Sequence, residues 1–272
     1  MVKKTLIISG AIVLILLIAL VFFFKKDSGN LASLKENGSI SVAALLNKAR
    51  DLQAKGDLAN LKDVYQKLVN DFPNSNEVMN WQKKAEDINI KLLFSPAITA
   101  KSALYEIKPG DTLTKIAREF KTTVDLIKKS NNLSEDRIMP GRKIKVWTAP
   151  FSMIVDKSQN ILILKSDEEI IKTYIVSTGK NNSTPVGNFK ITSKLVNPTW
   201  FRTGAVVPAG SPENILGTRW MGIDLPSYGL HGTIDPQNLG KQVTQGCVRL
   251  SNPDVEDLYT IVPLGSEVVI VD

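Results

Sequence analysis

The chain has 272 residues and a formal net charge of +7, and 43% of its residues are hydrophobic. This composition describes folded material over most of the length, and the length allows two domains or one domain with appendages. A single cysteine excludes an internal disulfide, and one cysteine with one histidine excludes a His/Cys metal cluster. No nucleotide-binding loop is visible, so we expect neither a metal nor another cofactor.

An uncharged apolar run lies near the N-terminus. Residues 5–24 read TLIISGAIVLILLIALVFFF, and a helix of that length is about 30 Å long, enough to cross a membrane. A cleaved signal peptide is the competing interpretation, but its apolar region is shorter and ends at small residues, whereas this run ends in FFFKK. We therefore predict a membrane anchor and tether over residues 1–30, and the flanking lysines favour an N-terminus inside and the remainder outside.

A helical pattern follows over residues 41–93. Apolar residues recur at three- and four-residue spacing, and the pattern breaks at KGD (residues 55–57) and FPNS (residues 72–75). Three helices are predicted, and the helix–turn–helix order resembles one tetratricopeptide unit. One such unit cannot bury a continuous core, so packing against another domain or a partner is one interpretation, and a plain spacer is the other.

Residues 103–148 predict a β-α-α-β order. A short strand precedes a turn at Pro109-Gly110, Asp111 can cap a first helix, and a second helix and a strand at 144–147 follow. The segments KPGDTL, IA, NNL and PG stand in the order found in LysM domains, which this region resembles. The resemblance implies binding of N-acetylglucosamine-containing glycans such as peptidoglycan, through the loops after Pro109-Gly110 and around Asn131-Asn132. The alternative is a domain that keeps the fold without the affinity.

Net charge supports an envelope partner for this region. Residues 101–149 carry 11 lysines and arginines against 6 aspartates and glutamates. A basic module often indicates nucleic acid, but the predicted export argues against that partner. We expect no nucleic acid, and either a polyanionic envelope surface or a merely solvated basic face.

Residues 150–272 predict a mostly-β domain. Short runs rich in β-branched residues alternate with Gly, Pro and Asn, and Asn252-Pro253-Asp254 can start a helix over residues 255–261. The predicted strands cover residues 152–155, 161–164, 170–178, 187–192 and 267–271.

The only histidine and the only cysteine, His231 and Cys247, stand close together in this region. A free thiol has a pKa of about 8.5, so it needs a base to act as a nucleophile near neutral pH, and an imidazole can serve. Gly246 can expose a backbone N–H to an oxyanion, and Arg249 would share a face with Cys247 on a strand. The alternative is that Cys247 is a buried apolar residue and that His231 has a purely structural role.

The region resembles the YkuD-type L,D-transpeptidases over essentially all its length. The residues that carry the resemblance are STGK (177–180), TPVGNF (184–189), NPTW (197–200), HG (231–232) and TQGCVRL (244–250). One departure is Gln245, where many members have a second histidine, so that the proton-transfer role falls on His231.

The resemblance implies a role for each residue of this motif. Cys247 attacks the peptide carbonyl before the D-alanine of a tetrapeptide stem, and His231 takes the thiol proton and returns it to the leaving amine. The Gly232 carbonyl orients the imidazole, and the N–H groups at Gly246 and Cys247 hold the oxyanion.

Two further residues have implied roles near the reacting groups. Arg249 holds a substrate carboxylate, with a structural salt bridge as the alternative, and Thr244 supports the loop through its hydroxyl group.

These expectations combine into a multidomain α+β protein with a transmembrane helix, a helical TPR-like segment, a βααβ LysM domain and a mostly-β catalytic domain. The expected reaction is a 3→3 cross-link between peptidoglycan stems in the bacterial cell envelope, with the bulk of the chain on the extracytoplasmic side. Water as the acceptor would instead give an L,D-carboxypeptidase, and a chain without catalysis would be a peptidoglycan-binding scaffold.

Overall fold

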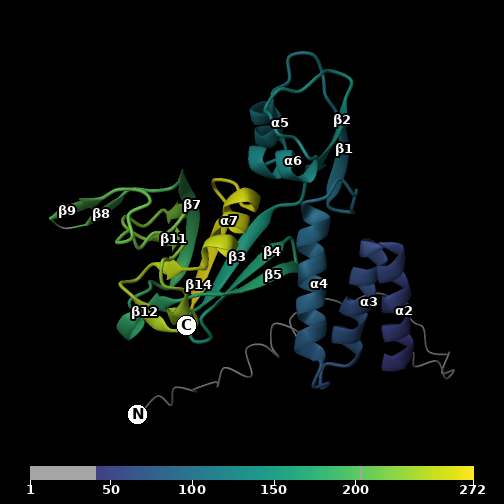
Figure 1. Cartoon of the computed structure of the whole chain (residues 1–272), viewed down its shortest axis with the longest axis horizontal. Helices are drawn as coiled ribbons and strands as arrows, with labels where there is room; N and C mark the ends of the chain where they lie inside the picture. Colours follow the sequence, from purple (N-terminus) through teal and green to yellow (C-terminus); the bar gives the residue numbers. More distant parts are fainter. Residues whose placement is uncertain (1–40, 203) are drawn as a thin grey trace, which may run out of the picture. The chain divides into compact units, whose positions relative to one another are not determined.

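A computed structural model describes residues 41–202 and 204–272. The predicted anchor and tether at residues 1–30 lie outside this range. Among the described helices, none combines the length and the apolar character needed to span a membrane. Figure 1 shows the helical segment, the small β-α-α-β unit and the large sheet in chain order from blue to yellow.

Three helices, α2 (Val42–Lys55), α3 (Leu58–Asp71) and α4 (Val78–Leu93), occupy the residues for which helices are predicted. Asp57 caps α3 by accepting a hydrogen bond from the Asn60 N–H. The helices bury one apolar cluster that follows the spacing seen in the sequence: Leu45, Ala49, Leu61, Val64, Tyr65, Leu68, Trp81, Ala85, Ile88 and Leu92. The likeness to a tetratricopeptide unit stays a prediction.

Helix α4 packs against β5 (Glu169–Ile175), the last strand of the large sheet (Figure 1). The Asn89 side-chain amide donates to the carbonyl oxygens of Ile170 and Ile171 at 3.1 and 3.3 Å. Leu93 joins the buried core of the sheet domain. Of the two interpretations of this segment, the contacts therefore favour packing against another domain.

The β-α-α-β unit consists of β1 (Ser102–Glu106), α5 (Leu113–Glu119), α6 (Val124–Ser130) and β2 (Lys143–Trp147). Its two strands pair antiparallel, with Ser102 opposite Trp147 and Glu106 opposite Lys143. Its core contains Ile107, Leu113, Ile116, Ala117, Ile127, Ile144 and Val146. The order of elements is the one predicted.

The residue that caps α5 differs from the one predicted. Thr112, not Asp111, caps α5 by accepting from the Lys115 N–H. Asp111 instead closes the preceding turn, because it accepts from the Tyr105 hydroxyl and the Lys108 N–H, both at 2.8 Å. The prediction that Asp111 caps the helix is therefore wrong.

The C-terminal domain is built on one eight-stranded sheet (Figure 1). In spatial order its strands are β13 (Val248–Arg249), β11 (Gly229–His231), β10 (Arg219–Ile223), β7 (Gly187–Val196), β14 (Glu267–Val271), β3 (Phe151–Asp156), β4 (Ile161–Ser166) and β5. Short pairs add to it: β6 (Thr178–Gly179) with β12 (Gln242–Thr244), and β8 (Trp200–Arg202) with β9 (Ala205–Val207). The helix α7 (Asn252–Ile261) begins where the Asn-Pro-Asp motif predicts.

The pairing register shows which side chains share a face of the large sheet. Side chains directly opposite on paired strands share a face, so Val248, Leu230, Met221 and Lys194 lie on one face. The first three pack in the core with α7. Their neighbours Arg249, His231, Trp220 and Leu195 therefore lie on the opposite face.

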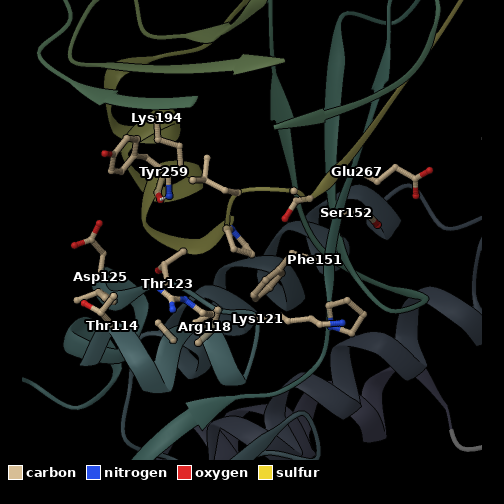
Figure 2. Close-up of a pocket in the computed structure, with 18 of the residues that line it drawn as sticks. Thr114, Arg118, Lys121, Thr123, Asp125, Phe151, Ser152, Lys194, Tyr259 and Glu267 are labelled. Atoms are coloured by element: carbon tan, nitrogen blue, oxygen red, sulfur yellow. Dashed lines mark hydrogen bonds between the residues drawn. The ribbon is translucent and has the colours of Figure 1, made fainter. Parts of the chain in front are cut away.

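A cleft of about 1020 Å³ lies between the β-α-α-β unit and the α7 side of the sheet. Figure 2 shows Thr114 and Arg118 on one wall, with Lys194 and Tyr259 on the other. Because Lys194 belongs to the face that carries α7, this cleft is separate from the face that carries His231.

Candidate active site

Parallel pairing of β11 and β13 brings the two unique residues together. Leu230 is opposite Val248 and His231 is opposite Arg249. Cys247 directly precedes β13 and therefore lies next to Gly229, two residues before the histidine. The sheet therefore brings together two residues, His231 and Cys247, that are sixteen positions apart in the sequence.

The imidazole of His231 is fixed by the backbone of the next residue. Nδ1 lies 2.7 Å from the Gly232 carbonyl oxygen, so a neutral ring donates from Nδ1 and keeps the lone pair on Nε2. Burial lowers the pKa of His231 from 6.5 to about 4, although the Gly232 carbonyl acts in the opposite direction. At neutral pH the ring is uncharged and can accept a proton.

Asn252, at the start of α7, holds the His-Gly segment in place. Its Oδ1 accepts from the Thr218 N–H at 3.2 Å and from the Thr233 N–H at 3.1 Å. A Cβ on Gly232 would lie 2.2 Å from this oxygen, so only glycine fits. The sequence places Asn252 at a helix start but carries no signal for this second role.

The Cys247 thiol is half-buried and donates to the Ser227 carbonyl oxygen at 3.6 Å. Within the described residues, no hydrogen bond joins this thiol to His231. Burial raises the pKa of Cys247 above 9.0, while the Gly229 N–H and the charge of Arg249 act to lower it. The resting pair is therefore a neutral thiol and a neutral imidazole.

Thr244 braces the loop before the cysteine. Its hydroxyl donates to the Cys247 carbonyl oxygen at 2.7 Å and accepts from the Gly246 N–H at 3.1 Å. The predicted support by the Thr244 hydroxyl has a direct counterpart in these two bonds. The Gly246 N–H, which we predicted to bind an oxyanion, therefore already donates to the Thr244 hydroxyl in this conformation.

Gly246 is enclosed on two sides. Its φ is +127°, and a Cβ there would lie 2.6 Å from a ring carbon of Tyr228. The Thr184 hydroxyl donates to the Gly246 carbonyl at 2.9 Å and accepts from the Gly179 N–H at 2.8 Å. The STGK and TPVG segments noted in the sequence are thus linked by hydrogen bonds to the loop that carries Cys247.

Arg249 is anchored through its backbone, which exchanges two hydrogen bonds with Ser177. In the described part of the chain its guanidinium forms no ion pair, and its buried Nε has no hydrogen-bond partner. The alternative of a structural salt bridge is therefore absent from this arrangement. Asp235 lies near enough to act on the charge of Arg249, and that charge in turn acts on the Cys247 thiol.

Trp220 was not identified from the sequence. Its indole stacks on the His231 ring with centroids 6.0 Å apart and an interplanar angle of 20°. No motif contains it, and only the pairing of β10 with β11 reveals the contact.

The arrangement offers a nucleophile, a base and a cation for acyl transfer. No group of three or more His, Cys, Asp or Glu residues within 41–202 and 204–272 could hold a metal ion. Fold and site together define a protein that joins a LysM-like module to an L,D-transpeptidase-like sheet domain.

Comparison with known proteins identifies the family. A model of the L,D-transpeptidase catalytic domain, YkuD, matches residues 150–270, and a LysM model matches residues 105–147. A Bacillus licheniformis protein named "Putative L,D-transpeptidase YkuD" is 33% identical over 175 residues, which cover 61% of this chain and 98% of that protein. The chain therefore belongs to the YkuD family of L,D-transpeptidases and contains a LysM domain, as the two resemblances predicted.

Two further proteins show partial similarity. The "Cell wall-binding protein YocH" of Bacillus subtilis is 42% identical over 76 residues, which cover 27% of this chain and 26% of that protein. A solved L,D-transpeptidase from Mycobacterium smegmatis has a TM-score of 0.40 and 20% identity, covering 48% of this chain and 64% of that one.

Proposed function

We propose that this chain is a cysteine-dependent L,D-transpeptidase that forms 3→3 cross-links between peptidoglycan stems. The observation that carries the proposal is the orientation of His231. Its Nδ1 is bound to the Gly232 carbonyl, which leaves a neutral Nε2 as the proton acceptor beside the Cys247 loop.

The first half-reaction forms an acyl-enzyme. Cys247 Sγ attacks the carbonyl carbon between the third stem residue and D-alanine, and the thiol proton passes to His231 Nε2. The carbon–nitrogen bond then breaks, and His231 returns the proton to the leaving amine of D-alanine. The thiol must first release the Ser227 carbonyl, to which it donates at rest.

Backbone N–H groups at Gly246 and Cys247 are the proposed oxyanion donors. The Gly246 N–H already donates to Thr244, so the Cys247 N–H is the better candidate in this conformation. Arg249 would bind a carboxylate of the stem, because its guanidinium forms no ion pair within the described residues and lies on the face of His231, although the charge of Asp235 also acts on it.

The second half-reaction transfers the acyl group. An acceptor amine from a neighbouring stem attacks the thioester carbonyl, gives up a proton through His231, and releases the Cys247 thiol. No oxidation or reduction occurs in either half, and the two peptide bonds, one broken and one formed, balance.

The LysM domain supports a role in holding substrate. We propose that it binds peptidoglycan glycan in the cell envelope, in keeping with the name of the YocH relative. Asn132 is exposed, whereas Asn131 is used internally, since its side chain bonds the backbone N–H and carbonyl of Lys145 at 2.7 Å. The loop contribution is therefore assigned to Asn132 and to the turn after Pro109-Gly110.

An N-terminal membrane anchor at residues 5–24, with the bulk of the chain outside, completes the proposal. Tethering the chain and binding the glycan would raise the local concentration of stems at the catalytic domain.

Product analysis with purified muropeptides tests the proposal. The wild-type chain should convert tetrapeptide stems into 3→3 dimers with release of D-alanine, and Cys247→Ser should abolish both products. Tripeptide without dimer would instead identify an L,D-carboxypeptidase. Intact binding to sacculi without either product would identify a scaffold, and dimer formation by Cys247→Ser would refute the assigned nucleophile.

A further inference from the structure

We infer that Trp220 is a positioning residue for His231, and that its indole covers one face of the imidazole and keeps water from it. The inference rests on the proposed function, because it concerns the ring assigned as the base. The two residues are directly opposite each other on β10 and β11. Their rings stack 6.0 Å apart at an angle of 20°.

Two glycines make room for the indole. Gly222 and Gly229 face each other across the same pair of strands. A Cβ at Gly222 would lie 2.9 Å from Trp220 Nε1, and a Cβ at Gly229 would lie 2.8 Å from Cζ2. Ser193 Oγ would lie 2.4 Å from the first Cβ and the Met221 carbonyl oxygen 2.6 Å from the second, so both glycines are closely enclosed and the indole fills part of that enclosure.

The indole also reaches the cysteine side of the site. Its far edge lies against Gly229, and the N–H of Gly229 is one of the groups that act on the Cys247 thiol. Trp220 is therefore one wall of the space that contains both reacting groups.

Covering the imidazole has a chemical consequence. His231 is only 2% exposed, and burial is the main cause that lowers its pKa to about 4. Removing the indole would let water solvate the charged ring, which stabilises the imidazolium form. A protonated His231 cannot take the thiol proton, so the base would be lost at mildly acidic pH.

The single histidine makes this measurable without reference to activity. In an NMR titration of the full chain, one imidazole signal reports His231. We expect Trp220→Ala to raise its pKa by about one unit or more, and Trp220→Phe, which keeps a ring, to change it by less than about half a unit.

Leu195→Ala is the matched control. Leu195 is opposite Trp220 on the other neighbouring strand, shares its face and is 51% exposed, but it is not opposite His231. This variant should leave the imidazole pKa within about half a unit of the wild-type value.

An unchanged imidazole pKa in folded Trp220→Ala, or an equal rise in Leu195→Ala, overturns the inference. If Trp220→Ala does not fold, Trp220→Val takes its place, because it removes the indole and keeps a β-branched side chain suited to a strand. A raised imidazole pKa in that variant supports the inference, and an unchanged one overturns it.

Activity is measured separately. If the proposed function is right, the acidic limb of kcat/KM moves with the imidazole pKa in each variant. A wild-type chain without transpeptidase activity refutes the proposed function, while the NMR titration still decides the role of Trp220.

Discussion

His231 Nδ1 and the Gly232 carbonyl oxygen lie 2.7 Å apart, so the imidazole is oriented by the backbone of its own neighbour. A carbonyl dipole stabilises an imidazolium less than a full negative charge would. Burial outweighs the carbonyl, which by itself raises the pKa, and lowers the pKa of His231 to about 4, so the ring stays neutral above that pH. The protonation of one ring should therefore be visible in both stability and chemistry.

Folding stability should depend on pH through His231. Its folded pKa of about 4 lies below the ordinary 6.5, so the unfolded chain binds more protons between these values. The stability contribution is present above pH 6.5 and is lost as the pH falls toward 4. Between pH 7 and pH 4 the wild-type chain should lose about 3 kcal/mol more than His231→Gln, measured by urea unfolding. Equal losses of unfolding free energy in the wild-type chain and in His231→Gln would contradict the lowered pKa of His231.

The reactivity of Cys247 should rise only at alkaline pH. Burial raises the pKa of its thiol above 9.0, so little thiolate exists at pH 7 in the free chain. Alkylation by iodoacetamide, followed by mass, should keep accelerating beyond pH 9. Full reactivity at pH 7 would instead indicate a resting thiolate–imidazolium pair.

Arg249→Gln should slow that alkylation, because the charge of Arg249 helps to lower the pKa of the thiol. Removing this charge raises the pKa of the thiol and so reduces the thiolate fraction and the alkylation rate at pH 8. Arg219→Gln is the control, since Arg219 lies near Glu256 of α7 at 3.9 Å and is not among the groups that act on the thiol.

Gly246→Ala should remove activity. The new Cβ would lie 2.6 Å from the Tyr228 ring at a φ of +127°, so the loop that carries Cys247 must move. A displacement of this kind should lower kcat/KM by about a hundredfold or more. Gly210→Ala also places alanine at positive φ, +76°, but nothing lies within 4 Å, so it should retain wild-type activity. Comparable losses in both variants would attribute the effect to backbone strain alone.

Asn252→Leu should destabilise the His-Gly segment. It leaves the Thr218 and Thr233 N–H groups without their acceptor, at a cost of about 1–3 kcal/mol each where they are buried. Asn252→Asp keeps an acceptor oxygen and adds a favourable charge at the start of α7, so it should retain most stability and activity. Thermal unfolding and kcat/KM of the two variants decide between loss of this acceptor and a general disturbance of the helix.

Much of the fold could be predicted because local patterns determine it. Short apolar runs rich in β-branched residues predicted strands near β3, β4, β5, β7 and β14, and apolar residues at three- and four-residue spacing predicted α2 to α4. The cap of α5 was misassigned because Asp111 and Thr112 are adjacent and both can cap a helix.

The site was harder to predict than the fold. Cys247 and His231 could be named as candidates because each is unique in the chain and stands in a segment that carries the YkuD resemblance, and their catalytic roles stay predictions. The contacts of Trp220 and Asn252 depend on strand register and on residues distant in sequence. Local periodicity carries no information about such contacts.

The position of α4 affects whether two copies of the chain can pair through the edges of their sheets. β5 is an outermost strand of the large sheet, and an uncovered outermost strand can pair with a strand of a second molecule and start aggregation. The Asn89 side-chain amide donates to two carbonyl oxygens of that strand. Lys62 forms a 3.0 Å ion pair with Glu169, the first residue of the strand. The helical segment thus covers the outermost strand, and we expect a chain without this segment to associate through that strand.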